Sequence, residues 1–234
     1  MEKWDQIQVD VDDFIAAGFG TAWHRYMAPF VTQVPGWYSE QTLQMQQGNM
    51  TIQGTLDLRC VAGAIEDFKC TSAWAFVFGK PEWEQQLNVY ALLCRANNIP
   101  VTSLTINAFL KDWSDRNVHQ YAPAYPDRPF HTVRIPLWNM EQQKKFVADK
   151  VADHLNGMRP CTPEEMWQRP STWAVLKPNM KKAMRVLDSE IGALNWLGAN
   201  TNKATNAYIQ HRPGSCRRCE SYCMVRSVCP YKQT

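Results

Sequence analysis

Two neighbouring segments with a regular alternation of apolar and polar residues constrain the fold of this chain more than any other feature. In residues 51–59, apolar side chains alternate with polar ones that include Asp57. The alternation continues through residues 61–69, where Asp67 and Lys69 share a face. A period of two residues is typical of β-strands. The two segments are therefore predicted to form an antiparallel β-hairpin.

The charges on this hairpin need an explanation. If its turn centres near Ala62, Asp57 and Asp67 lie directly across from each other, and Thr55 faces Lys69. Directly opposed like charges destabilise a pair of strands. A divalent metal ion held by both carboxylates, with the ammonium group nearby, would compensate for this repulsion. These are the groups of a phosphodiester-cleaving site in outline.

The remaining pattern predicts further elements in an α/β order. Helices are expected over residues 10–28 (ended by Pro29), 81–97 and 140–155, strands over 101–110 and 130–135, and a loop over 115–129. Helix, hairpin, helix and strand in this order predict a mixed central sheet flanked by helices.

The pattern changes after Gly157, where a small α+β appendage is expected. The predicted domains are therefore residues 1–157 and 158–234. A capping box at Thr162-Pro163-Glu164-Glu165 predicts the start of a short helix. A strand, a helix and a second strand are expected to follow over residues 173–176, 189–197 and 207–210.

Composition limits the possible partners and the cellular compartment of the protein. The chain has 234 residues and a net charge of +3, which permits nucleic-acid binding without arguing for it. No segment contains the roughly 18 consecutive apolar residues of a membrane span, and the first residues lack a signal-peptide pattern. An intracellular protein is expected. Four of its eight cysteines lie in the last nineteen residues, which in a reducing compartment suggests metal ligation.

Three residues outside the hairpin complete a constellation. His24 lies on the first expected helix, and Gln86 and Tyr90 lie at i and i+4 on the next one, so they share a face. With the hairpin and the cysteines, this order resembles the RecB-like branch of the PD-(D/E)XK nuclease superfamily. The resemblance covers about residues 14–110 and the C-terminal cysteines.

More narrowly, the chain resembles the bacteriophage-type exonucleases of that branch. The C-terminal pattern that carries this likeness consists of Arg212-Pro213-Gly214, Arg218-Cys219-Glu220, Tyr222-Cys223, and Cys161-Thr162 with Trp167. The resemblance implies a restriction-endonuclease-like core, that is, a mixed sheet flanked by helices.

The resemblance also implies roles for the hairpin residues. His24, Asp57, Asp67 and the main-chain carbonyl of Phe68 would bind Mg²⁺ or Mn²⁺. Lys69 would orient or activate the attacking water and stabilise charge on the phosphate. Hard oxygen ligands suit these ions, and a nearby lysine adds electrostatic stabilisation.

The implied roles extend to the next helix, and one position departs from the pattern. Gln86 and Tyr90 match a QxxxY motif, which contacts DNA and supports the site in that branch. Asp67 stands where many members of the superfamily carry glutamate. Glu66 is expected to point to the opposite face, so it is left out of the site.

The cysteines allow two ligand sets. One uses the four local residues Cys216, Cys219, Cys223 and Cys229. The other replaces Cys216 with the distant Cys161, and the resemblance favours this set, with Cys216 as the alternative ligand. Four thiolates suit a 4Fe–4S cluster or structural Zn²⁺. The related domains hold iron–sulfur clusters, so 4Fe–4S is preferred, as a structural staple for the C-terminus.

The expected function is a Mg²⁺- or Mn²⁺-dependent deoxyribonuclease, more an exonuclease than an endonuclease, in phage or prophage DNA recombination, processing or degradation. Its partners would be DNA and a phage recombination or single-strand-binding protein, in the cytoplasm of a bacterial host and away from the membrane. One alternative is a non-catalytic DNA-binding or interaction protein on a nuclease scaffold. Another makes the cysteines a zinc ribbon for partner recognition. Taken alone, His24 would be interpreted as a packed helix residue, and Asp57 and Asp67 as solvated carboxylates on an exposed sheet face.

Overall fold

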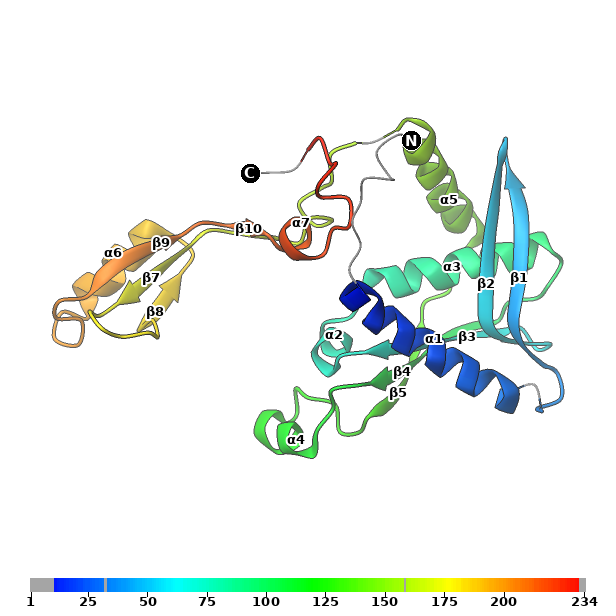
Figure 1. Cartoon of the computed structure of the whole chain (residues 1–234), viewed down its shortest axis with the longest axis horizontal. Coiled ribbons are helices and arrows are strands. Elements are labelled where there is room, and N and C mark those ends of the chain that lie inside the picture. The colour runs from blue at the N-terminus through cyan, green and yellow to red at the C-terminus, as the bar shows by residue number, and fades with distance from the viewer. Residues whose placement is uncertain (1–10, 32, 158, 232–234) are drawn as a thin grey trace. The chain divides into compact units, whose positions relative to one another are not determined.

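The computed structural model describes residues 11–31, 33–157 and 159–231 (Figure 1). The chain divides into two compact units, one spanning Asp10–Met158 and the other including Arg159–Thr234. The described residues of the first unit contain one sheet, and those of the second contain two. No helix among the described residues is long and apolar enough to cross a membrane.

A five-stranded mixed sheet forms the centre of the first unit, in the order β1-β2-β3-β4-β5. Its strands are β1 (Trp37–Gln47), β2 (Met50–Cys60), β3 (Ala64–Thr71), β4 (Ser103–Leu110) and β5 (Phe130–Ile135). Only the β3–β4 pairing is parallel among these neighbours. The helices of this unit are α1 (Val11–Val31), α2 (Ala73–Phe78), α3 (Pro81–Ala96), α4 (Asp115–Tyr121) and α5 (Met140–Leu155). A mixed sheet flanked by helices was predicted, and it is consistent with a restriction-endonuclease-like core.

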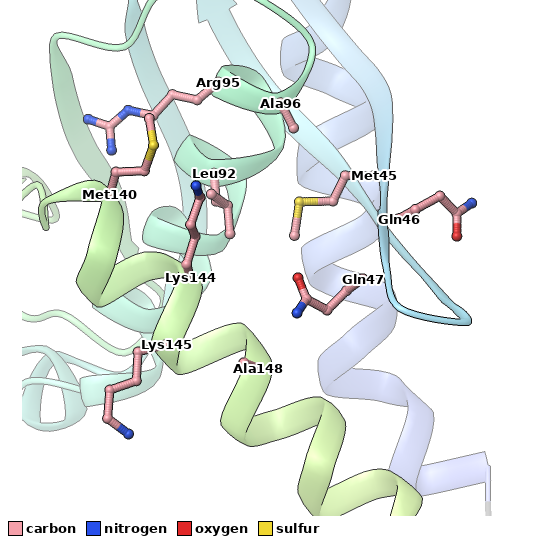
Figure 2. Close-up of a pocket in the computed structure, with 10 residues that line it drawn as sticks. All are labelled: Met45, Gln46, Gln47, Leu92, Arg95, Ala96, Met140, Lys144, Lys145 and Ala148. Carbon is pink, nitrogen blue, oxygen red and sulfur yellow. The ribbon is translucent and has the colours of Figure 1, made fainter.

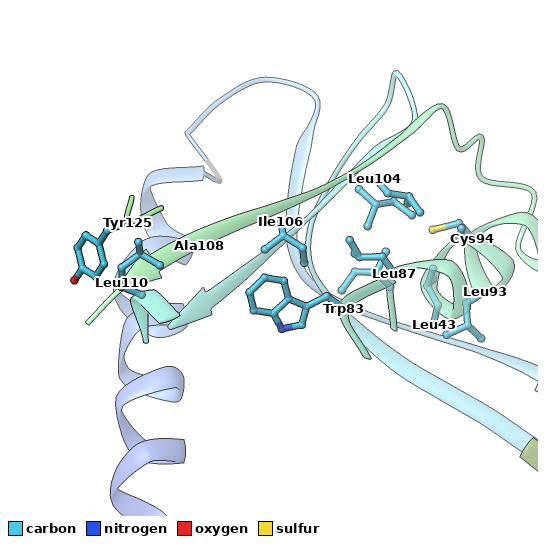
Figure 3. Packing of buried hydrophobic residues seen from close by; sticks show 14 residues of the cluster. Leu43, Trp83, Leu87, Leu93, Cys94, Leu104, Ile106, Ala108, Leu110 and Tyr125 are labelled. Carbon is cyan, nitrogen blue, oxygen red and sulfur yellow. The ribbon is translucent and has the colours of Figure 1, made fainter. Parts of the chain in front are cut away.

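Helix α3 covers one face of this sheet and forms its core. The predicted helical stripe is buried, with Leu87, Ala91 and Cys94 at 0% exposure. It packs on strand residues that include Ile106 and Ala108 (Figure 3). Burying one large aliphatic side chain contributes about 1.5–3 kcal/mol. The core therefore fixes α3 firmly against β3 and β4.

Helix α1 lies against the opposite face. The ring of Trp23 stacks on Phe109 with a centroid distance of 4.7 Å. Phe109 follows Ala108, which packs on the α3 side, and successive strand residues point to opposite faces. The sheet is thus held between α1 and α3, and side chains from both helices can reach the end of β2.

The predicted hairpin forms, with its turn centred on Ala62. The ladder pairs Leu58 with Glu66 and Arg59 with Ile65. This register confirms the expected alignment of Asp57 with Asp67, although the pairing stops one position before them. The expected facing of Thr55 and Lys69 is wrong. The β2–β3 ladder ends at Leu58 and Glu66, so Thr55 and Lys69 are paired only on their other edges, with Thr42 of β1 and Ala108 of β4.

Two predicted boundaries in the first unit are also wrong. Helix α1 continues through Pro29 to Val31, because a proline in the last turn removes only one backbone hydrogen bond. The segment predicted as a loop contains α4, whose N-cap Ser114 accepts a hydrogen bond from the backbone of Asn117. That capping signal was present in the sequence.

The second unit contains a three-stranded antiparallel sheet in the order β8-β7-β9. Its elements are β6 (Gln168–Arg169), β7 (Thr172–Leu176), β8 (Arg185–Leu187), α6 (Glu190–Ala199), β9 (Tyr208–Arg212), β10 (Ser215–Cys216) and α7 (Arg217–Ser221). Helix α6 packs on β7, and Ala174, Val175 and Ala193 are fully buried there. The predicted strand, helix and second strand are present as β7, α6 and β9, but β8, which was not predicted, lies between the first two.

The helix predicted to begin at Thr162 is wrong. Residues 163–167 form turns rather than a helix. The capping box itself is present, since Thr162 Oγ1 accepts from Glu165 N at 3.2 Å and Glu165 Oε2 accepts from Thr162 N at 2.8 Å. Trp167 has a φ of +52°, a left-handed conformation that ends the turn and leads the chain into β6.

Candidate functional site

The site begins where the β2–β3 ladder ends. Asp57 lies one residue beyond Leu58, the paired residue of β2 that is farthest from the turn. It is buried, with 8% exposure. Its Oδ2 accepts a hydrogen bond of 2.8 Å from the backbone N–H of Phe68. The side chain thus replaces a backbone acceptor on the neighbouring strand. This bond fixes the carboxylate between the two separating strands.

His24 approaches this carboxylate from α1. Its Nδ1 lies 3.3 Å from Asp57 Oδ1, and its Nε2–H donates to the carbonyl oxygen of Phe68 at 3.0 Å. The hydrogen bond to Asp57 is the largest cause that raises the pKa of His24 from 6.5 to about 9. Without a metal ion, the imidazole is therefore protonated at neutral pH. Three of the four predicted ligands, His24, Asp57 and the Phe68 carbonyl, are in direct contact.

Asp67 is the most deeply buried acid of the site, with 1% exposure. Burial is the largest cause that raises its pKa from 3.8 to about 6, and the charge of Asp57 raises it further. Lys69 Nζ forms an ion pair with Asp67 Oδ2 at 2.7 Å, and its charge and hydrogen bond partly offset this rise in the pKa. Asp67 Oδ1 has no hydrogen-bond partner among the described residues. A buried carboxylate with an unmet acceptor fits a cation ligand.

Lys69 connects this carboxylate to α3. Its Nζ donates to Gln86 Oε1 at 2.8 Å, and Gln86 Nε2 donates to Tyr90 Oη at 2.8 Å. The predicted i and i+4 pair on α3 therefore does share a face, and it holds the lysine. The chain Tyr90–Gln86–Lys69–Asp67 fixes the position of the ammonium group beside the carboxylate.

Gly54 of β2 makes room for Tyr90. A Cβ atom at Gly54 would lie 2.8 Å from Tyr90 Cε1 and 3.0 Å from Leu93 Cδ1. Such distances are too short for any side chain. The glycine therefore allows α3 to lie close enough to the hairpin for Gln86 to reach Lys69.

Glu40 of β1 belongs to the site and was missed in the sequence. One ligand atom each of His24, Glu40 and Asp57 lies within 4.8 Å of the other two, and Glu40 Oε1 is 3.9 Å from His24 Nδ1. Its φ of +51° is unusual for a residue other than glycine. Such strain tends to occur at functional sites.

A like-charge argument identifies Glu40 once the β1–β2 register is known. The β1–β2 ladder pairs Ser39 with Leu58 and Gln41 with Leu56. Glu40 therefore lies at the position opposite Asp57, where no β-bridge forms. A carboxylate across from Asp57 repeats the like-charge argument that first identified the hairpin. That argument requires the β1–β2 register, which the sequence alone did not provide.

A cleft between α1 and β1 leads to this group. Its volume is about 820 Å³, and it is lined by Thr21, His24, Arg25, Ala28, Pro29, Ser39 and Glu40. Substrate and cofactor clefts of folded proteins fall in the range of roughly 300–1,000 Å³. The site is therefore accessible from solvent, although Asp57 and Asp67 are buried.

The oxygen and imidazole donors of this site fit a divalent metal ion. Carboxylates and a backbone carbonyl suit Mg²⁺ and Mn²⁺, and an imidazole is a common additional ligand of Mn²⁺ and other transition metals. The buried Oδ1 of Asp67, which has no hydrogen-bond partner among the described residues, is the observation that calls for such an ion. A bound cation would compete with the proton of His24, because the imidazole must be neutral to ligate.

The predicted cysteines gather in the second unit. Burial raises the pKa of the Cys219 thiol, and four other thiols raise it further by their charge: Cys216, Cys223, Cys161 and Cys229. The distant Cys161 is thus a neighbour of the C-terminal group. No three of these thiols lie within 4.8 Å of one another, since the only group of that kind in the described part of the chain is His24, Glu40 and Asp57. Which four would ligate stays a prediction.

Residues that follow Cys161 in the sequence contact the segment that contains Cys216 and Cys219. Arg218 donates to the carbonyl oxygens of Met166 and Glu165, at 3.1 and 3.2 Å. The short β6–β10 ladder pairs Gln168 with Cys216 and Arg169 with Ser215. Residues 161–169 are therefore held beside residues 215–222.

Comparisons with known proteins give weak likenesses. No family model matches the chain, and a search of curated proteins finds no match. Among solved structures, the protein SSO0001 shares 14% identity over 58% of this chain, with a TM-score of 0.39. A candidate exonuclease from Eubacterium rectale shares 13% identity over 66% of this chain, also with a TM-score of 0.39. The chain spans 59% of the length of each. At these values, a functional assignment depends on the geometry of the site.

Proposed function

We propose that this protein is a metal-dependent deoxyribonuclease. The observation that carries the proposal is the buried Asp67 carboxylate, which has an unmet acceptor, pairs with Lys69 and lies near Asp57 and His24. The oxygens and imidazole of the first unit would hold the ion, and the ammonium group lies next to them. This combination suits the hydrolysis of a phosphodiester.

Different residues would bind the metal ion and stabilise the phosphate. Asp57, Asp67, His24 and the Phe68 carbonyl would hold Mg²⁺ or Mn²⁺, and Glu40 adds a further carboxylate at the solvent side. When bound, such an ion lowers the pKa of water and neutralises charge on a phosphate. Lys69 stabilises the charge that develops on the scissile phosphate. Gln86 and Tyr90 keep the lysine in position.

The finer features of the proposal come from the sequence resemblance. An exonuclease is preferred to an endonuclease, with a role in phage or prophage DNA recombination, processing or degradation inside a bacterial cell. A phage recombination or single-strand-binding protein would be its partner. A non-catalytic DNA-binding protein is the alternative. The series of side-chain contacts from Tyr90 through Gln86 and Lys69 to Asp67 favours catalysis over it.

The second unit would hold a 4Fe–4S cluster through Cys161, Cys219, Cys223 and Cys229, with Cys216 as the alternative ligand. The observation that supports it is the influence of four neighbouring thiols on Cys219. Such a cluster would fix the C-terminal segment. Anaerobically purified protein should absorb at about 400 nm, whereas colourless protein that contains zinc would overturn this assignment.

Nuclease activity is tested with labelled linear and circular DNA in Mg²⁺, Mn²⁺ or EDTA. The wild-type protein should degrade linear DNA only with a metal ion, and Lys69→Ala should lose this activity while keeping its circular dichroism spectrum. Lys150→Ala, an exposed lysine of the same unit, serves as the control and should cleave normally. Retained cleavage in both Lys69→Ala and Asp67→Ala would contradict the assignment. Cleavage of circular DNA would instead indicate an endonuclease.

A further inference from the structure

A second groove in the first unit lies apart from the candidate active site. It is formed by the end of β1, the last turns of α3 and the first half of α5, and its volume is about 580 Å³ (Figure 2). We propose that this groove binds a short acidic segment of a partner protein, which inserts one large apolar side chain. The proposal concerns an interaction surface and is independent of the nuclease assignment.

The inner surface of the groove is apolar. Its lining includes Met45 of β1, Leu92 and Ala96 of α3, and Met140 and Ala148 of α5. Figure 2 shows Met45 pointing from the strand toward α5, across the open space. Methionine side chains adapt to differently shaped partners. Such a surface suits an apolar side chain better than a phosphodiester backbone.

The charged residues that line the groove are all positive. Arg95, Lys144 and Lys145 line it, and no carboxylate does. Lys144 makes no ion pair with the residues that the structure describes, and Figure 2 shows it pointing from α5 toward Leu92. Arg95 donates to Gln143 Oε1 at 2.6 Å, which is a neutral partner. The groove therefore carries positive charge that acidic side chains would complement.

The neighbouring Lys145 differs from Lys144 and supplies a matched control. Its Nζ is paired with Asp149 Oδ2 at 2.7 Å. In Figure 2 it points away from the space between α5 and β1. The charge of Lys145 is thus already compensated. The proposal requires Lys144 and not Lys145.

The walls of the groove are held in place before any partner binds. Gln143, at 1% exposure, donates through Nε2 to Asn88 Oδ1 at 3.1 Å, and its own Oε1 accepts from Arg95. This buried network links α3 to α5. A preformed site loses little entropy on binding, so even a short segment can bind.

Fluorescence anisotropy tests the proposal with a labelled hexapeptide in which five aspartates and glutamates surround one phenylalanine. Measurements in EDTA keep binding separate from cleavage. The wild-type protein should bind this peptide saturably, and Lys144→Gln should weaken binding about fivefold, whereas Lys145→Gln should change it less than about twofold. Ala148→Phe, which fills the groove and keeps its charges, should abolish binding.

Control ligands separate the two parts of the recognition. A peptide with serine in place of phenylalanine, and one with amides in place of all carboxylates, should each bind at least about tenfold more weakly. Absent wild-type binding, equal losses in the two lysine variants, or equal binding of a control peptide overturns the proposal. An oligothymidylate that displaces the peptide and depends equally on Lys144 would assign the groove to nucleic acid and also overturn it.

Discussion

The two candidate ligand groups of this chain differ in how far the protein alone arranges them. In the first unit, His24, Glu40 and Asp57 bring ligand atoms within 4.8 Å of one another. In the second unit, four other thiols are close enough to influence Cys219, but no three of the five thiols reach that spacing among the described residues. The first group is set by the fold, whereas the second would be closed by its ion or cluster.

The secondary-structure elements that carry the two ligand groups explain this difference. The acids are on β1, β2 and β3, and α3 packs against all three strands. Cys216 and Cys219 lie in β10 and α7, which are two and five residues long, and the other three cysteines lie outside helices and strands. Elements this short have little buried surface of their own. Metal binding then contributes directly to the folding of such a region, while an acidic site must be stabilised by the rest of its domain.

The largest expected effect tests the cysteine side of this comparison. Cys219→Ser should remove absorbance at about 400 nm and make residues 159–234 sensitive to proteolysis, because the ligated state would no longer hold them. The first unit should keep its Mn²⁺-dependent rise in melting temperature. Cys70→Ser, outside the cluster, serves as the control. Unchanged absorbance and protease resistance in Cys219→Ser would remove the contrast between the two units.

Cys216→Ser separates the two ligand sets by the same measurements. It should retain the absorbance band if Cys161 is the fourth ligand. Complete loss of the band in Cys216→Ser, with retention in Cys161→Ser, would replace the preferred set by the local one.

The second prediction concerns Asp67, where function opposes stability. Asp67→Asn should lower metal-dependent cleavage by at least about a thousandfold. In EDTA at pH 8, it should raise the free energy of unfolding by on the order of 1–2 kcal/mol, because the buried charge is removed. Chemical denaturation of both proteins measures this gain.

The pH dependence of that gain has a defined sign. The pKa of Asp67 is raised from 3.8 to about 6, so the ionised carboxylate costs stability above pH 6. The cost declines as the pH falls through 6 and disappears below 3.8, where the group is protonated in both states. An Asp67→Asn protein that is less stable than wild type at pH 8 would show that Lys69 outweighs the burial.

A third prediction tests the packing that supports the site. Gly54→Ala should push Tyr90 and Leu93 away from β2, lower stability by about 1–3 kcal/mol and reduce cleavage. Gly18→Ala provides the contrast, since a Cβ there meets nothing within 4 Å. In a helix, that change should stabilise by about 0.5–1 kcal/mol. Similar effects of both substitutions on unfolding would mean that the close approach of α3 is unimportant.

The smallest expected effect concerns Glu40. It is half exposed, whereas Asp57 is buried and accepts the Phe68 hydrogen bond. Glu40→Gln should therefore weaken Mn²⁺ binding only about tenfold, and Asp57→Asn should weaken it much more. Calorimetric titration gives both values, and the reverse order would make Glu40 the principal ligand.

The parts that the sequence predicted correctly rest on long regular patterns. Alternation in residues 51–69 located the hairpin and its register, and helical spacing placed Gln86 and Tyr90 on one face of α3. Glu40 was missed because its role depends on the β1–β2 register and on a left-handed backbone. The turns after Thr162 were predicted as a helix because a capping box stabilises a single turn as well as the start of a helix.

The central claim is that the acids of the first unit hold the metal ion used for DNA cleavage. The most direct measurement is a calorimetric Mn²⁺ titration of wild-type and Asp67→Asn protein, with cleavage of linear DNA followed in the same samples. The account predicts that wild-type cleavage rises with Mn²⁺ occupancy, and that Asp67→Asn loses both binding and cleavage. Full cleavage by Asp67→Asn, or by wild-type protein in EDTA, would contradict it.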